Sequence, residues 1–80
     1  MTIFECYGHG RHGAALVGAE NRAMAVQACR EWLGWDVCVV FRAPEKYRLW
    51  QSCGGSEETP VVYAEDGEQY EAVILRRGGR

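Results

Sequence analysis

The residues best suited to chemistry lie at the end of the chain, which reads Ile74-Leu75-Arg76-Arg77-Gly78-Gly79-Arg80. The paired glycines have no side chains, so this stretch could thread a narrow channel in backbone conformations closed to other residues. Such a tail suits a protein whose C-terminal carboxyl group enters another protein's active site. It therefore predicts a chain that is acted upon by enzymes and is not itself one. The alternative is a solvated basic end without such a role.

A second set of candidate residues, Cys6, His9 and His12, recurs at intervals of three. Thiolates and imidazoles bind zinc, so a fourth ligand elsewhere would complete a site. A cysteine beside a histidine could also act as a nucleophile with its base. We expect neither, because the spacing does not match a usual structural zinc pattern and both histidines fall in a glycine-rich turn. We therefore assign no catalytic residue, no metal and no cofactor to this chain.

Size and composition predict one small domain. The chain has 80 residues, and its 48% hydrophobic content is enough for a single core. A net charge of −2 gives no support to nucleic-acid binding, and no apolar run approaches the roughly 20 residues of a membrane span. The four cysteines form no CxxC pair, so we expect free, buried thiols in a cytoplasmic protein, with a disulfide as the alternative.

Hydrophobic patterning predicts the order of the elements. Alternation and turn residues indicate strands or extended segments at residues 2–7, 14–18, 36–42, 47–53, 61–64 and 69–75. Residues 21–33 have the spacing of a helix, with Asn21 as N-cap, Gly34 at its end and an apolar face that includes Met24, Ala28 and Trp32. We therefore expect an α+β domain in which a mixed sheet packs on one central helix.

These features resemble ubiquitin and its β-grasp relatives. The similar parts are Met1-Thr2-Ile3-Phe4, the glycine-rich turn at residues 8–13, the helix at 21–33, Arg48-Leu49-Trp50, and the run from Ala72 to Gly79. The resemblance implies a β-grasp domain over residues 1–75 and a C-terminal tail over residues 76–80. The arginine-rich tail and the cysteine-bearing body are most similar to bacterial ubiquitin-like modifiers.

The family's chemistry implies a role for each residue of the tail. A peptidase would remove Arg80, and an E1-like activating enzyme would use ATP to activate the Gly79 carboxylate behind Gly78. An E2-like carrier would then pass the chain to an acceptor protein, often in antiphage defence. Leu75, Arg76 and Arg77 would hold the tail on its partners, since arginines form paired hydrogen bonds with carboxylates.

The same resemblance assigns further residues in the body. Trp50 and Val73 would point outward together as a partner-binding face, unless the loop at residues 54–59 covers Trp50. Lys46 is the only lysine and does not match any acceptor lysine of the family; if chains form, Lys46 and the N-terminal amine are the amines that could accept them.

Two other functions stay open. A sulfur carrier of the β-grasp class also ends in Gly-Gly, although such carriers usually lack the Leu-Arg-Arg lead-in. A small binding protein, such as a phage-encoded inhibitor, would instead use a surface patch and be indifferent to the tail.

Overall fold

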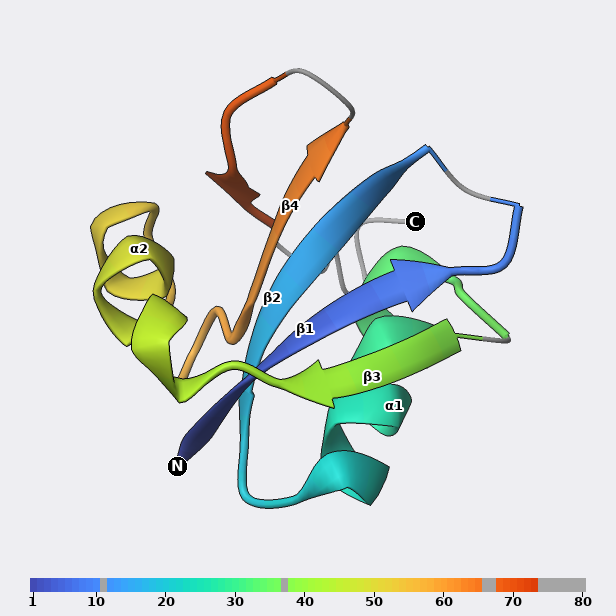
Figure 1. Cartoon of the computed structure of the whole chain (residues 1–80), viewed down its shortest axis with the longest axis horizontal. Helices are drawn as coiled ribbons and strands as arrows, with labels where there is room; N and C mark the ends of the chain where they lie inside the picture. The colour runs from blue at the N-terminus through green and yellow to red at the C-terminus, as the bar shows by residue number, and fades with distance from the viewer. Residues whose placement is uncertain (11, 37, 66–67, 74–80) are drawn as a thin grey trace.

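The computed structural model describes residues 1–10, 12–36, 38–65 and 68–73. In chain order the elements are β1 (Thr2–Gly8), β2 (Gly13–Ala19), α1 (Arg22–Leu33), β3 (Cys38–Arg42), the 3-10 helix η1 (Pro44–Lys46), α2 (Tyr47–Ser52), β4 (Val61–Glu65) and β5 (Glu71–Ala72). Figure 1 shows one sheet with α1 behind it and α2 set well apart from α1. The chain is therefore α+β, as its sequence predicts. No helix in these ranges is long and apolar enough to cross a bilayer.

The N-terminal hairpin supplies the two central strands of the sheet, whose order is β3-β1-β2-β4-β5. Each of the four pairings is antiparallel, so the mixed sheet expected from the sequence is wrong for the described strands. The reason lies in the path of α1, which carries the chain from β2 to the far side of β1. Strands β2 and β3 thus run in the same direction, but β1 separates them and no parallel pair forms.

The helix α1 begins and ends where the sequence predicts. Asn21 accepts a hydrogen bond at its Oδ1 from the Met24 backbone N–H at 2.9 Å, which satisfies one free donor of the first turn. Gly34 adopts φ 73°, and its N–H donates to the Arg30 carbonyl at 3.1 Å. A left-handed glycine in this position ends a helix without a steric cost.

One face of the sheet packs against α1 and forms the larger core. Ala25 and Cys29 of α1 are fully buried there. The buried strand residues of this core alternate along each strand, as expected for one face of a sheet; they are Phe4, Cys6, Ala15, Val17, Ala19, Val40 and Val61. All four cysteines are free thiols, of which Cys6 and Cys29 are buried and the other two are half-buried.

Residues 47–53, expected as a strand, form the helix α2 and its cap instead. Pro44 starts the preceding turn η1, because its fixed φ angle suits a first helical position, and η1 runs directly into α2. Trp50 and Cys53 are three residues apart, so a helix places both on one side. They face Ile3, Leu16 and Val62, on the sheet face opposite α1.

The carbonyl oxygen of Pro60 holds the loop between α2 and β4. It accepts the backbone N–H of Gly18 at 3.0 Å and the indole Nε1–H of Trp50 at 2.8 Å. Gly55 lies against the indole ring, where an added Cβ would come within 2.3 Å of Trp50 Cε2. The loop therefore covers Trp50, whose exposed fraction is only 3%.

The contact between Gly55 and Trp50 gives a first prediction. Gly55→Ala should lower the free energy of unfolding by about 1–3 kcal/mol, because the new methyl group must displace the indole. Urea denaturation followed by circular dichroism measures the change. Gln51→Ala is the matched control, since Gln51 is exposed on α2, and should stay within about 0.5 kcal/mol of wild type. Equal free energies of unfolding for Gly55→Ala and Gln51→Ala would contradict the close packing of Gly55 against Trp50.

Candidate functional site

The tail proposed to carry the chemistry, from Ile74 to Arg80, lies outside the described residues. The structure does show where it begins. The last described residue, Val73, is half-buried against the core beneath α1, and its N–H donates to the Val61 carbonyl at 2.8 Å. Val73, which precedes the tail, therefore pairs with the first residue of β4 and packs its side chain on the α1 side of the sheet.

The proposed partner face of Trp50 and Val73 is wrong as a single exposed surface. Trp50 belongs to the core cluster with Leu16 and Val62, whereas Val73 packs on the opposite cluster with Val61. The register explains this, because Val61 and Val62 are consecutive residues of β4 and point to opposite faces. Helix formation at residues 47–52 then turns Trp50 inward.

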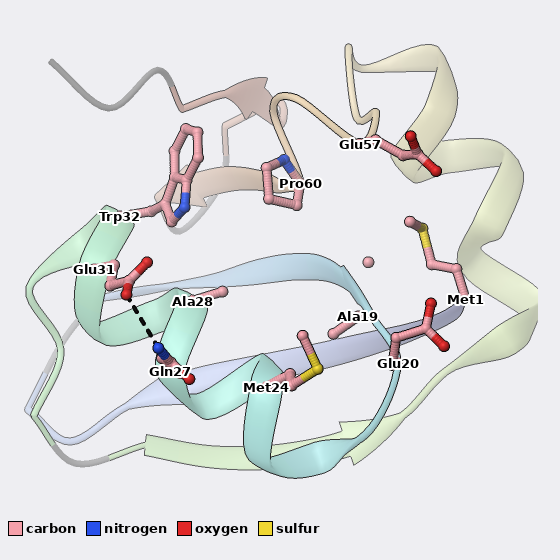
Figure 2. Close-up of a pocket in the computed structure, with 11 residues that line it drawn as sticks. Met1, Ala19, Glu20, Met24, Gln27, Ala28, Glu31, Trp32, Glu57 and Pro60 are labelled. Carbon is pink, nitrogen blue, oxygen red and sulfur yellow. Dashed lines mark hydrogen bonds between the residues drawn. The ribbon is translucent and has the colours of Figure 1, made fainter. Parts of the chain in front are cut away.

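A groove of about 390 Å³ runs between α1 and the loop that leads into β4. Its apolar lining consists of Met1, Ala19, Met24, Ala28, Trp32 and Pro60, with the backbone of Gly18. Figure 2 shows Trp32 at one end of the groove and Met1 at the other. Met1 and Met24 are 54% and 48% exposed, so flexible thioether side chains lie open on both sides. Such a surface can adapt to an apolar side chain.

Glutamates surround this apolar lining. Glu20, Glu31 and Glu57 are the charged residues among the described lining, and no lysine or arginine accompanies them there. Gln27 donates from Nε2 to Glu31 Oε2 at 3.2 Å, which holds one carboxylate at the rim (Figure 2). The groove is thus suited to a segment that combines an apolar side chain with positive charges.

The sequence pattern alone does not reveal this groove, although part of its signal is present. Met24, Ala28 and Trp32 recur at helical spacing, which predicts an apolar face packed on the sheet and not a groove wall. The opposite wall comes from Glu57 and Pro60, some 30 residues later in the chain. Their position depends on the Pro60 contacts with β2 and α2, which no local pattern reveals.

A second surface is the uncovered part of the sheet face opposite α1. Tyr7, Val39 and Phe41 are 41%, 54% and 53% exposed there, on β1 and the edge strand β3. Tyr7 pairs with Val39 across the strands, and the Tyr7 and Phe41 rings meet edge to face with centroids 6.2 Å apart. An exposed aromatic cluster on an edge strand is a plausible contact surface for another protein.

An ion pair lies beside this surface and involves the proposed acceptor Lys46. Its Nζ donates to Glu5 Oε2 at 3.0 Å, and the Tyr7 hydroxyl donates to the same oxygen at 2.9 Å. Burial alone would raise the pKa of Glu5, but the hydrogen bonds from Lys46 and Tyr7 outweigh it and lower that pKa. The hydrogen bond to Glu5 raises the pKa of Lys46. Lys46 is therefore held by Glu5, so a reaction at its amine would first have to break this pair.

Cys6, His9 and His12 do not form a site. Cys6 is fully buried in the α1 core, while both histidines are exposed in the turn. Among residues 1–10, 12–36, 38–65 and 68–73, no three histidine, cysteine or acidic side chains are grouped so that they could hold a metal ion. A hydrogen bond with Cys6, together with burial, raises the pKa of the Cys29 thiol, and burial raises that of Cys38, so these thiols stay protonated.

The Glu5–Lys46 pair predicts a pH-dependent stability. Lys46→Met should lower the free energy of unfolding at pH 7 by up to about 1 kcal/mol, the scale of partly exposed ion pairs. The lowered pKa of Glu5 stabilises the folded state above its ordinary value of 4.5, and this stabilisation is lost as acid protonates the carboxylate. The raised pKa of Lys46 stabilises the folded state below 10.5, and this stabilisation is lost as alkali deprotonates the amine. The difference from wild type should thus be largest between these limits, in urea titrations at several pH values. Arg48→Met is the control, and a pH-independent difference would contradict the pairing.

Comparisons with known proteins identify no relative of this chain. No family model matches the chain, and neither a curated protein nor a solved structure matches it. The small antiparallel sheet and its helices make an α+β fold, which is compatible with a β-grasp fold.

Proposed function

We propose that this chain is the precursor of a bacterial ubiquitin-like modifier, processed after Gly79 and conjugated through the Gly79 carboxylate. The order of residues at the C-terminus carries the proposal: two apolar residues, then Arg76-Arg77, Gly78-Gly79 and one further residue. The body supports it as a small α+β scaffold that fastens the chain at Val73, directly before this tail. A cytoplasmic location and a role in antiphage defence belong to the same proposal.

The proposed chemistry takes place in partner enzymes. A peptidase hydrolyses the bond between Gly79 and Arg80. An E1-like enzyme then joins the freed carboxylate to AMP from ATP, releasing pyrophosphate. A nucleophile on the E1-like or E2-like partner takes the acyl group and releases AMP, and an acceptor protein then takes the acyl group and frees that nucleophile. Glycine at positions 78 and 79 leaves the carboxyl carbon open to each nucleophile, because no Cβ obstructs its approach.

Chain formation on the body itself would favour the N-terminus. Lys46 is paired with Glu5 at 3.0 Å and its side chain is only 34% exposed, so a reaction there would first have to break this pair. The N-terminal residue Met1 is 54% exposed and offers the other primary amine. The main acceptor would then be a different protein.

A sulfur carrier would use the same glycine terminus for a different product. In that case sulfur replaces one carboxylate oxygen at Gly79, and no lasting bond to a protein forms. The mass of the processed chain separates the two: a thiocarboxylate is heavier than a carboxylate by the difference between sulfur and oxygen.

The tail gives a direct test in cells that carry the chain's natural partners. An N-terminally tagged chain should lose Arg80 and form higher-mass adducts, visible by immunoblot and intact mass spectrometry. Gly79→Ala should abolish the adducts, because the methyl group lies beside the reacting carbon. Trypsin cuts after arginine, so digested adducts should carry Gly78-Gly79 on an acceptor side chain.

A chain that ends at Gly79 is the matched control and should form adducts without the peptidase. Normal adduct formation by Gly79→Ala, or by a form in which Arg80 cannot be removed, would overturn the assignment. Unchanged circular dichroism of each variant shows that the fold is intact.

A second candidate function, a non-enzymatic binding protein, is favoured by the exposed apolar cluster of Tyr7, Val39 and Phe41. Contiguous exposed apolar side chains commonly mark protein contacts, and aromatic residues often dominate their binding energy. Such a protein would act through this sheet face and would not need residues 78–80.

Two variants separate the two functions. Removal of residues 78–80 should abolish adducts but preserve non-covalent partner capture. Phe41→Thr should weaken that capture at least about tenfold, because it removes an exposed ring at a position where threonine suits a strand. Affinity measurements with the captured partner test this, and equal affinity of Phe41→Thr and wild type would rule out this face.

A further inference from the structure

We infer that the groove beside α1 is a docking site for the chain's own basic tail. The groove is lined by Met24, Trp32 and Pro60 and edged by Glu20, Glu31 and Glu57. Its occupant would be the segment from Ile74 to Arg80 of the same molecule. This goes beyond conjugation, since it concerns where the tail lies when no partner holds it.

The described chain ends close to the groove. Val73 is hydrogen-bonded to Val61, and the neighbouring residue Pro60 lines the groove. Val73 and Trp32 also pack on the same core cluster. Seven residues follow Val73, and an extended segment of that length reaches about 25 Å. The 12-residue helix that forms one wall is only about 18 Å long, so the tail can reach every part of the groove.

The chemistry of the tail is complementary to that of the groove. Ile74 and Leu75 offer apolar side chains for the methionine and tryptophan lining, and three arginines follow them. The rim offers three glutamates, one of them held in place by Gln27. Arginine forms charge-assisted hydrogen bonds with carboxylates and also stacks on tryptophan, here Trp32.

The distribution of charge favours the same molecule over other occupants. All 11 acidic residues precede position 74, whereas the tail carries three of the nine basic residues and no acid. The tail is therefore attracted to its own body. Its attachment at Val73 also gives it an effective concentration near the groove that a free peptide or a second copy must exceed.

Docking would regulate the proposed conjugation, and this consequence alone rests on the proposed function. A tail held in the groove would place Gly78 and Gly79 against α1 rather than in an enzyme's channel. A peptidase or E1-like partner would first have to displace it. Partners with acidic residues near their own channels could do so by competing for Arg76 and Arg77.

Nuclear magnetic resonance of the full-length chain tests the docking. The three tryptophans give three indole N–H signals, and Trp32→Phe identifies the one in the groove. The combined change Arg76→Gln, Arg77→Gln and Arg80→Gln should move the Trp32 signal and the Met24 methyl signal. The signals of the buried Trp35 and Trp50 should stay in place. Arg48→Gln on α2 is the control and should move none of the groove signals.

A double-mutant comparison separates docking from a general change of charge. Glu31→Gln with Glu57→Gln should move the Trp32 signal in the same direction as the tail changes do. Both sets together should produce no further shift, because the contact is already lost. Glu45→Gln with Glu65→Gln, both exposed and outside the groove, is the matched control. In 1 M salt, where screening acts within about 3 Å, the wild-type signals should approach those of the tail variant.

Three different results would contradict the docking of the tail. A Trp32 signal unaffected by the tail changes would overturn the docking, as would fully additive shifts from the two sets of variants. A shift that grows with protein concentration, with dimers in sedimentation, would show that a second copy binds the tail and would overturn the intramolecular form. None of these readouts involves a partner enzyme, so failure of conjugation through Gly79 leaves the docking result standing.

Discussion

The carbonyl oxygen of Pro60 is the contact on which much of this arrangement depends. It accepts one hydrogen bond from β2 and one from the indole of α2, so it ties the loop, the sheet and the second helix together. The buried indole N–H would otherwise lose its partner, at a cost of roughly 1–3 kcal/mol. Gly55 allows the loop to close over the ring, because any side chain there would strike it. The same contacts hold Pro60 at the edge of the groove.

The two faces of the sheet present different surfaces because different helices cover them. The longer helix α1 buries one face and, with the loop before β4, forms an acidic, methionine-lined groove. The short helix α2 covers only part of the other face and leaves Tyr7, Val39 and Phe41 exposed. Val73, the residue that precedes the basic tail, packs on the first of these faces. The Glu5–Lys46 pair lies on the second, where it holds the only lysine.

Local patterns predicted most elements correctly, for reasons that can be named. Asn21 and Gly34 mark the ends of α1 because capping satisfies free backbone groups within a few residues. The hairpin of β1 and β2 followed from alternation on both sides of a glycine-rich turn. The segment after Pro44 was misassigned, since six residues with alternating polarity suit a strand as well as a short helix. What decided it was burial of Trp50 against Leu16 and Val62.

The sequence by itself determined the local and chemical features of this protein: the caps of α1, the hairpin, the free thiols and a tail of arginines and glycines. These depend on neighbouring residues, so a single stretch of chain specifies them. Only the tertiary structure decided that the strands pair antiparallel throughout, that Trp50 is buried and that Met24, Trp32 and Pro60 meet beside three glutamates. Those outcomes depend on where α1 crosses the sheet and on contacts between residues far apart in the chain, which hydrophobic pattern alone does not encode.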